Sequence, residues 1–310
     1  MERERKSLII LKPKKIMTAE ASSVAEMQVG AQRKRQIWRI ITRNKATLLG
    51  LVLVLSIIAF ATVGSLVSPY SPNKINPAEK LALPGEEHFL GTDQFGRDIL
   101  SRLISGARVS LLVGVLSVAL ATVVGVTLGA LTGFFGGWLD EGIMRGVDIL
   151  MSFPYIILAI ALAAALGPGF GNVILILSVI RIPVFARVSR AAVMAVTQQE
   201  YVLAATGIGQ TRLNILFRHV LPNSLTAVIV VASLSVATAI NAEAAISFLG
   251  LGIRPPQASW GNMLADAQLY ILTAPWLGIA PGLLISLTVL GFNLLGDGLR
   301  DILDPRMRTS

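Results

Sequence analysis

Six apolar runs constrain this chain more than any other feature of its sequence. Each approaches the roughly 20 residues that an α-helix needs to cross about 30 Å of hydrocarbon. Hydrophobic residues make up 54% of the 310 residues and charged residues only 15%, which is too apolar for an ordinary soluble domain. We therefore predict an all-α membrane protein with six transmembrane helices, at residues 46–67, 109–131, 149–166, 172–188, 225–249 and 276–295.

Basic residues are concentrated at the N-terminus. Residues 1–46 carry twelve Lys and Arg against four Asp and Glu, whereas the rest of the chain is nearly balanced. A basic tail can bind nucleic acid, but this one adjoins the first apolar run, so topology and attraction to lipid headgroups explain it more simply. Residues 1–45 are predicted to be a cytoplasmic arm with no nucleic-acid partner. Six crossings then place both termini in the cytoplasm.

A polar, basic stretch at residues 199–223 separates two apolar runs and faces the cytoplasm in this topology. Gly207 and Gly209 interrupt it, because glycine costs about 1 kcal/mol relative to alanine inside a helix. Apolar residues then recur at helical spacing, at Leu213, Leu216 and Phe217. We predict two short amphipathic helices with a bend near Gly209, which must bury their apolar stripes against headgroups or a partner. An ordinary interfacial loop is the alternative.

Another amphipathic segment precedes the second apolar run, at residues 91–111. Its apolar stripe consists of Ile99, Leu100, Leu103 and Ile104, with Arg97, Asp98 and Arg102 elsewhere on the helix. We predict an interfacial helix that serves packing and anchoring rather than substrate handling. The chain is thus divided into the arm, a unit at 46–104 with the first span, an external loop and this helix, and a five-helix core at 105–310 that includes the 199–223 loop.

Glycines and prolines indicate how some spans pack or bend. Gly125, Gly129 and Gly133 recur every four residues and share one helix face, which allows close packing on another helix of this chain or on a partner subunit. Pro154 is expected to kink the third span. The fourth apolar span is interrupted by Arg181 and Pro183.

Two charged residues fall inside predicted spans, Arg181 in the fourth and Glu243 in the fifth. Charges within hydrocarbon are expensive and usually functional, so both are candidates for lining a solute pathway. For each, the alternative is a buried polar contact that positions helices. At 1.5 Å per residue their depths differ by about 10 Å, so a direct pair requires Arg181 to reach outward.

The chain lacks the residues that several kinds of chemistry require. The chain has no cysteine, which excludes disulfides and thiolate sites. It has no Gly-Lys pair and therefore no P-loop, so any ATP hydrolysis must come from another polypeptide. The two histidines, His88 and His219, are predicted on opposite faces and cannot share one metal or one intramembrane site. We expect no catalytic residue, metal site or cofactor in this chain, and interpret His219 as a structural or interfacial donor.

Several segments together resemble a known family. The order Glu200, Ala204-Ala205, Gly209, Ile215, Leu221-Pro222 resembles the EAA loop of ABC importer permeases. G-T-D-Q-F-G-R-D at 91–98, R-H-V-L-P-N at 218–223, I-N-A-E-A-A-I-S-F-L-G-L-G at 240–252 and F-N-L-L-G-D-G-L-R-D at 292–301 resemble the dipeptide/oligopeptide/nickel permeases, in particular their C-type subunit. The resemblance extends from residue 35 to residue 306 and leaves out little but the leader.

This resemblance implies a type I ABC importer permease fold, in which the 199–223 loop forms a cytoplasmic coupling helix that docks on a separate ATPase subunit. The coupling residues implied by matching position are Glu200, Ala204, Ala205, Gly209, Ile215, Leu216, Phe217, Leu221 and Pro222. Two positions depart from the family pattern. Leu203 precedes Ala204-Ala205, so the Glu-Ala-Ala triplet is not literally present, and Arg181 stands where the family tends to carry an uncharged residue.

The resemblance also implies partners: a second related permease, two ATP-binding subunits that hold the ATP and magnesium, and an extracytoplasmic solute-binding protein, in a bacterial or archaeal cell membrane. The expected function is ATP-driven import of dipeptides or oligopeptides. Nickel and glutathione-like solutes of the same family remain open alternatives. An ion-coupled secondary carrier is less well supported, because such carriers more naturally show internal repeats, and none is recognisable here.

Overall fold

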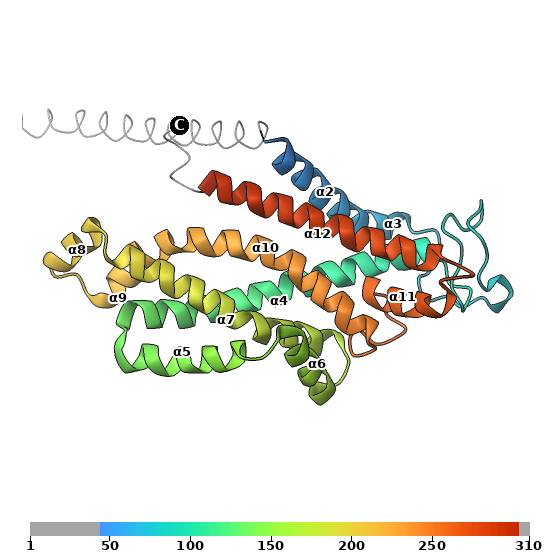
Figure 1. The fold of residues 1–310 in the computed structure, drawn as a ribbon. Helices are drawn as coiled ribbons and strands as arrows, with labels where there is room; N and C mark the ends of the chain where they lie inside the picture. Colours follow the sequence, from blue (N-terminus) through green and yellow to red (C-terminus); the bar gives the residue numbers. More distant parts are fainter. Residues whose placement is uncertain (1–43, 304–310) are drawn as a thin grey trace, which may run out of the picture.

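The structure, a computed structural model, describes residues 44–303. The predicted arm up to residue 43 and the tail after residue 303 lie outside this range. The described part is almost entirely helical (Figure 1), which confirms the predicted all-α class. Its helices are α2 Lys45–Thr62, α3 Gly64–Val67, η1 Pro77–Glu79, α4 Ile99–Phe135, α5 Gly137–Met151, α6 Tyr155–Leu166, α7 Phe170–Thr197, α8 Glu200–Gly207, α9 Arg212–Ile215, η2 Leu216–Val220, α10 Leu221–Phe248, α11 Trp260–Ala267, η3 Gln268–Tyr270 and α12 Trp276–Leu303.

Five helices in the described range are long and apolar enough to cross a membrane. They are α2, α4, α7, α12 and the run Arg212–Phe248, which joins α9, η2 and α10. Figure 1 shows them lying along the long axis of the molecule, with α7 against α4 and α12 against both α2 and α10. The bent pair α5 and α6 supplies a sixth apolar segment. Each predicted span therefore corresponds to a helix or to this pair.

The third predicted span is broken rather than kinked. α5 and α6 meet at 90° across residues 152–154. Pro154 has no N–H, and its ring disfavours a helical conformation in the residue before it, so α5 ends and a new helix starts at Tyr155. By contrast Pro183 lies inside α7 without ending it, so the fourth span is one continuous helix.

The predicted interfacial helix and the second span form one helix, α4, of 37 residues. Asp98 caps its N-terminus by accepting a hydrogen bond from the N–H of Ser101 at 2.7 Å. The apolar stripe that suggested an interfacial helix is buried inside the protein, with Ile99 and Leu103 fully enclosed. Arg97 and Arg102 are buried too, because both form ion pairs with Asp93, at 2.6 and 3.4 Å. The segment thus packs, as expected, but against the chain's own core.

The glycine face of α4 packs on α7. A Cβ on Gly125 would lie 2.5 Å from the Cβ of Phe185, and one on Gly133 would lie 2.7 Å from the carbonyl oxygen of Arg190. A Cβ on Gly129 would also collide with the backbone of α7. Of the two options that the sequence leaves open, the partner is therefore a helix of this chain, and the two backbones approach closely over about two turns.

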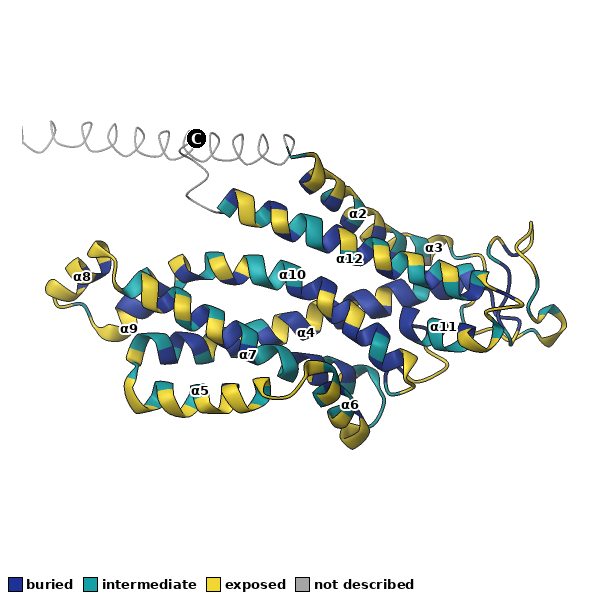
Figure 2. Cartoon of the chain, in the orientation of Figure 1, coloured by how far each residue is buried: buried dark blue, intermediate teal, exposed yellow. Residues whose placement is uncertain are grey.

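Burial differs between the two ends of the molecule (Figure 2). Buried positions concentrate toward the end that carries α11, whereas exposed positions dominate α5 and α8. Trp260, the first residue of α11, is fully buried, and its indole N–H donates to the carbonyl oxygen of Leu103 at 3.1 Å. The α11 end is consequently held by core packing, while the α8 end presents side chains to the surroundings.

Candidate functional site

The 199–223 loop forms two helices joined by a bend. α8 and α9 are separated by residues 208–211, and Gly209 in this connection has a φ of 78°, which glycine adopts without strain. Thr211 caps α9 by accepting a hydrogen bond from the N–H of Asn214. The predicted bend near Gly209 and the short helix before it are confirmed.

The second of these helices is not separate from the span that follows. α9 passes through η2, a π-helical turn, directly into α10. In that turn the N–H of Leu221 donates to the carbonyl oxygen of Leu216, five residues earlier. Pro222 lies at the start of α10, as predicted, but no break precedes it. A push on α9 is therefore transmitted to α10 through continuous helix.

One face of the 199–223 loop packs on the body of the protein. Ala205, Ile215 and Leu216 are buried in a cluster with Ala130 of α4 and Val193 of α7. The cluster also contains Val202 and Val220, with Leu221 packed against it. Of the residues predicted to contact an ATPase, Ala205, Ile215 and Leu216 are thus buried within the chain, and Leu221 packs against the same cluster. They fix the loop to the ends of two long helices.

The other face of the loop is exposed and partly apolar. Ile208 is 76% exposed and Phe217 is 63% exposed, and Leu203 and Leu213 are more than half exposed. Glu200, Ala204, Gly209 and Pro222 also lie at the surface. The sequence prediction missed Leu203 and Ile208 as surface residues, although apolar side chains opposite the buried stripe of a short helix were the available signal. Leu213 belongs to the apolar stripe that the sequence predicted. A small apolar patch at the end of the molecule is typical of an interaction site.

His219 has a structural role in this loop. Its Nε2 lies 3.0 Å from Oε1 of Gln210, next to Gly209, and its carbonyl oxygen accepts a hydrogen bond from the Asn223 side chain at 2.7 Å. These contacts connect the bend to η2 and α10. They agree with the interpretation of His219 as a structural donor.

Glu243 is enclosed at the centre of a polar cluster in the α11 half of the molecule. Its two carboxylate oxygens accept hydrogen bonds from Ser110 of α4 at 2.9 Å and from Ser247 of α10 at 2.7 Å. The same serine oxygens accept from backbone N–H groups, Ser110 from Trp260 and Ser247 from Ile253, both at 3.3 Å. Glu243 has no exposed surface, so in this conformation it lines no open space. The geometry favours the alternative, a contact that positions helices.

Arg181 lies apart from Glu243, near the middle of α7. Its side chain is partly buried, and none of the ion pairs formed among residues 44–303 includes it. The structure therefore does not bring the two intramembrane charges together.

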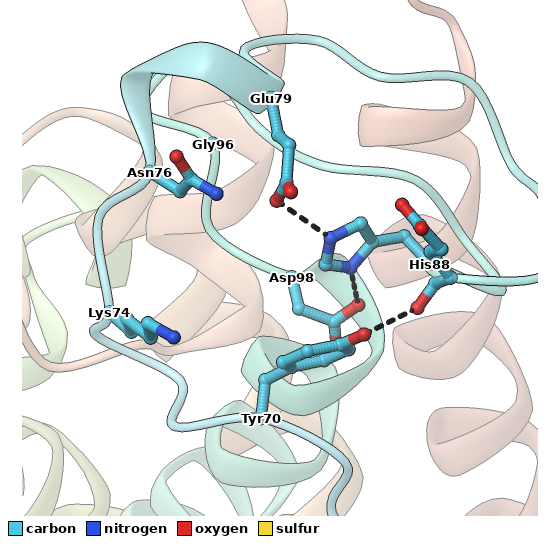
Figure 3. A pocket seen from close by; sticks show the side chains of 8 residues that line it. Tyr70, Lys74, Asn76, Glu79, His88, Gly96 and Asp98 are labelled. Carbon is cyan, nitrogen blue, oxygen red and sulfur yellow. Dashed lines mark hydrogen bonds and ion pairs between the residues drawn. The ribbon is translucent and has the colours of Figure 1, made fainter.

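A polar pocket opens at the end of the molecule opposite α8 (Figure 3). Its volume is about 240 Å³, and Tyr70, Lys74, Glu79, His88 and Asp98 line it. Nδ1 of His88 lies 2.8 Å from Asp98 and Nε2 lies 3.1 Å from Glu79, while the Tyr70 ring packs at 4.6 Å. A protonated His88 donates to both carboxylates, and so connects η1 to the start of α4.

This arrangement makes the attachment of residues 74–98 depend on pH. Burial lowers the pKa of His88, but hydrogen bonds and attraction to Asp98 and Glu79 outweigh it, so the pKa is raised above its usual value. The stabilisation that protonated His88 gives to residues 74–98 is therefore complete below a pH of about 6.5, and it is lost as the pH rises through the raised pKa of His88. Protection factors from hydrogen exchange in residues 74–98 should fall over that range, whereas His88→Gln should give a low, flat profile. A flat profile in the unsubstituted protein would contradict this.

Comparison with protein-family models decides the family. The model of the binding-protein-dependent transport system inner membrane component matches residues 125–309, and that of the N-terminal TM domain of oligopeptide transport permease C matches residues 33–84. The chain belongs to the binding-protein-dependent transport permeases. It is accordingly an integral inner-membrane component of a transport system and not a catalytic enzyme.

Individual relatives of this permease cover nearly its whole length. It is 41% identical to the dipeptide transport system permease protein DppC of Alkalihalophilus pseudofirmus, over 96% of this chain and 98% of the relative. It is 42% identical to the di/tripeptide permease DppC of Pseudomonas aeruginosa, over 89% of this chain and 93% of the relative. It is 41% identical to the glutathione transport system permease protein GsiD of Pectobacterium atrosepticum, over 89% of this chain and 92% of the relative.

A solved structure shows the same fold. A chain of the MetNI methionine ABC transporter, in an inward facing conformation, superimposes with a TM-score of 0.55. The match covers 65% of this permease and 96% of that chain, at 20% sequence identity. The permease therefore has the ABC importer fold, and its family associates with other components of ABC systems.

Proposed function

We propose that this permease is one of the two membrane subunits of an ATP-driven importer of dipeptides or oligopeptides. The observation that carries the proposal is the 199–223 loop, which is fixed to the ends of α4 and α7 on one face and exposes an apolar patch on the other. The names of the relatives support peptides as substrates, and GsiD supports glutathione as the alternative. A nickel complex is a further alternative within the family resemblance.

The proposed mechanism is mechanical. Two ATPase subunits close on ATP, and the one that contacts the exposed face of α8 and α9 moves the 199–223 loop. Because Ile215 and Leu216 attach the loop to α4 and α7, and α9 continues into α10, the displacement reaches the spans directly. The spans then exchange between inward-facing and outward-facing arrangements, which is a shift of population between two packings.

We place the α8 end in the cytoplasm together with both termini, since the basic arm favours that side. A groove of about 560 Å³ lies between α7, α10 and α12 near this end. Asn223, the last residue of the 199–223 loop, lines it together with Arg300 of α12. Movement of the loop would therefore change the width of this groove.

The proposed assembly contains a second permease, two ATP-binding subunits and an extracytoplasmic binding protein that delivers the solute. ATP and magnesium are held by the ATPase subunits, and this chain binds no cofactor and no nucleic acid. The test is reconstitution of the complete assembly in proteoliposomes with ATP inside. Dialanine and glutathione are offered in turn, and ATP-dependent uptake of dialanine is expected. Uptake by this chain alone, without nucleotide or companion subunits, would contradict the proposal.

The apolar patch of the 199–223 loop should be needed for ATPase attachment. Ile208→Glu places a charge where a partner surface must bury an apolar side chain, and hot-spot residues of this kind cost about 2 kcal/mol or more when lost. Co-purification of the ATPase subunits should therefore fall by more than about tenfold. Leu272→Glu is the matched control, because Leu272 is even more exposed than Ile208, at 94% against 76%, but lies at the opposite end of the molecule. Equal loss in both variants would show a general folding defect.

A further inference from the structure

Arg181 occupies a position in α7 where a charge is costly. It follows the first residue of α7, Phe170, by eleven positions, which is about 17 Å along a helix of 28 residues. The helix is apolar enough to span a membrane, so the guanidinium lies near the middle of the hydrocarbon layer. Charged side chains at that depth face protein or a water-filled cavity and have a specific partner.

The neighbouring helix α5 supplies partners for the other arginines on this part of α7. Arg190 forms a two-pronged ion pair with Asp140 at 2.6 Å, and Arg187 pairs with Asp148 at 2.6 Å. α5 runs antiparallel to α7, so six or seven residues beyond the pair of Asp148 and Arg187 the two chains reach Arg181 and, at the start of α6, Tyr155. The helix breaks here between α5 and α6, and Tyr155 takes the place that an aspartate has in the first two pairs. None of the ion pairs within the described residues includes Arg181.

The break beside Arg181 is itself exposed. Residues 152–155 are all exposed, although they include non-helical backbone at membrane depth. Irregular backbone is tolerated at that depth only where it is buried by protein or lines a water-filled space. Arg181 and the break therefore mark one surface that cannot face lipid tails.

We propose that Arg181 binds the terminal carboxylate of the peptide as it passes through the transporter, an inference that rests on the proposed function. Guanidinium presents a planar pair of donors that matches a carboxylate. Tyr155, at the start of the neighbouring α6, offers a hydroxyl as a further donor. A free peptide always carries such a carboxylate, whatever its side chains, so one fixed arginine serves many sequences.

The test uses the complete transporter with its binding protein in proteoliposomes, and dialanine as the probe. Arg181→Gln should lower ATP-driven dialanine uptake by more than about tenfold, because charge-assisted hydrogen bonds are lost. ATP hydrolysis stimulated by dialanine-loaded binding protein should change by less than about twofold, and the second permease should co-purify as before. Arg181→Lys should retain part of the uptake, and Arg181→Glu should lose more than Arg181→Gln.

Arg187→Gln is the matched control. It removes an arginine from the same helix, but one whose exposed ion pair lies within this chain, so uptake should stay within about twofold. Unchanged uptake in Arg181→Gln would overturn the proposal. Parallel loss of uptake, ATP hydrolysis and the second permease would also overturn it, since Arg181 would then pair with an acidic residue of that subunit. Failure of the unsubstituted transporter to import dialanine would instead contradict the proposed function.

Discussion

Replacing Gly209 by valine is expected to uncouple ATP hydrolysis from transport. Gly209 has a φ of 78°, a conformation in which a β-branched residue is strained by about 1–2 kcal/mol. No atom lies within 4 Å of the position that a Cβ would take, so the effect acts through the backbone and not through a clash. The bend between α8 and α9 should open or shift, and dialanine uptake by the reconstituted transporter should fall by more than about tenfold while ATP hydrolysis persists.

Gly207→Ala is the control for this prediction. Gly207 ends α8 only two residues away, and a Cβ there also meets no atom within 4 Å. Its φ is not positive, so alanine fits without strain and should leave uptake and hydrolysis unchanged. Normal uptake in Gly209→Val would count strongly against the lever role of the 199–223 loop.

Replacing Glu243 by alanine is expected to release the segment between α10 and α12 from the core. The change removes the acceptor of two buried hydroxyls, Ser110 and Ser247, at about 1–3 kcal/mol each, and leaves a cavity as well. Because these hydroxyls also hold the backbone N–H groups of Ile253 and Trp260, both amides should exchange hydrogen much faster. Hydrogen exchange measured by mass spectrometry on the purified transporter checks this result.

Glu243→Gln removes the negative charge of this side chain but keeps its shape. Glutamine keeps the volume but offers one acceptor in place of two, so we expect an intermediate exchange rate, intact assembly and altered uptake. Asn241→Ala provides the control, since Asn241 is exposed on the same helix two residues earlier. Protection of Ile253 and Trp260 that is equal in Glu243→Ala and in the unsubstituted protein would show that the serines hold this segment without the carboxylate.

The sequence predicts best what is decided locally. The apolar runs identify the spans because hydropathy acts on each helix by itself, and Gly209 marks the bend because its backbone conformation excludes most other residues. The continuity of α4 was missed for a nonlocal reason. Arg97 and Arg102 indicate a water-facing helix when taken alone, but ion pairs with Asp93 let them be buried.

The remaining differences depend on contacts between distant residues. Pro154 predicts that a helix ends, but the sequence does not show that α5 lies along α7, where Asp140 pairs with Arg190 and Asp148 with Arg187. Within the 199–223 loop, sequence spacing does not distinguish Leu216, which packs inward, from Phe217, which points out. That assignment requires knowing that α4 and α7 end beneath the loop.

The glycine contacts between α4 and α7 limit how this permease can move. Helices whose main chains touch through Gly125, Gly129 and Gly133 cannot slide or rotate past each other without a collision. Ala130 and Val193, from the same two helices, also seat the 199–223 loop. A displacement of that loop must therefore move the two helices together as one rigid unit. Relative movement between helices then has to occur where other helices pack against this pair.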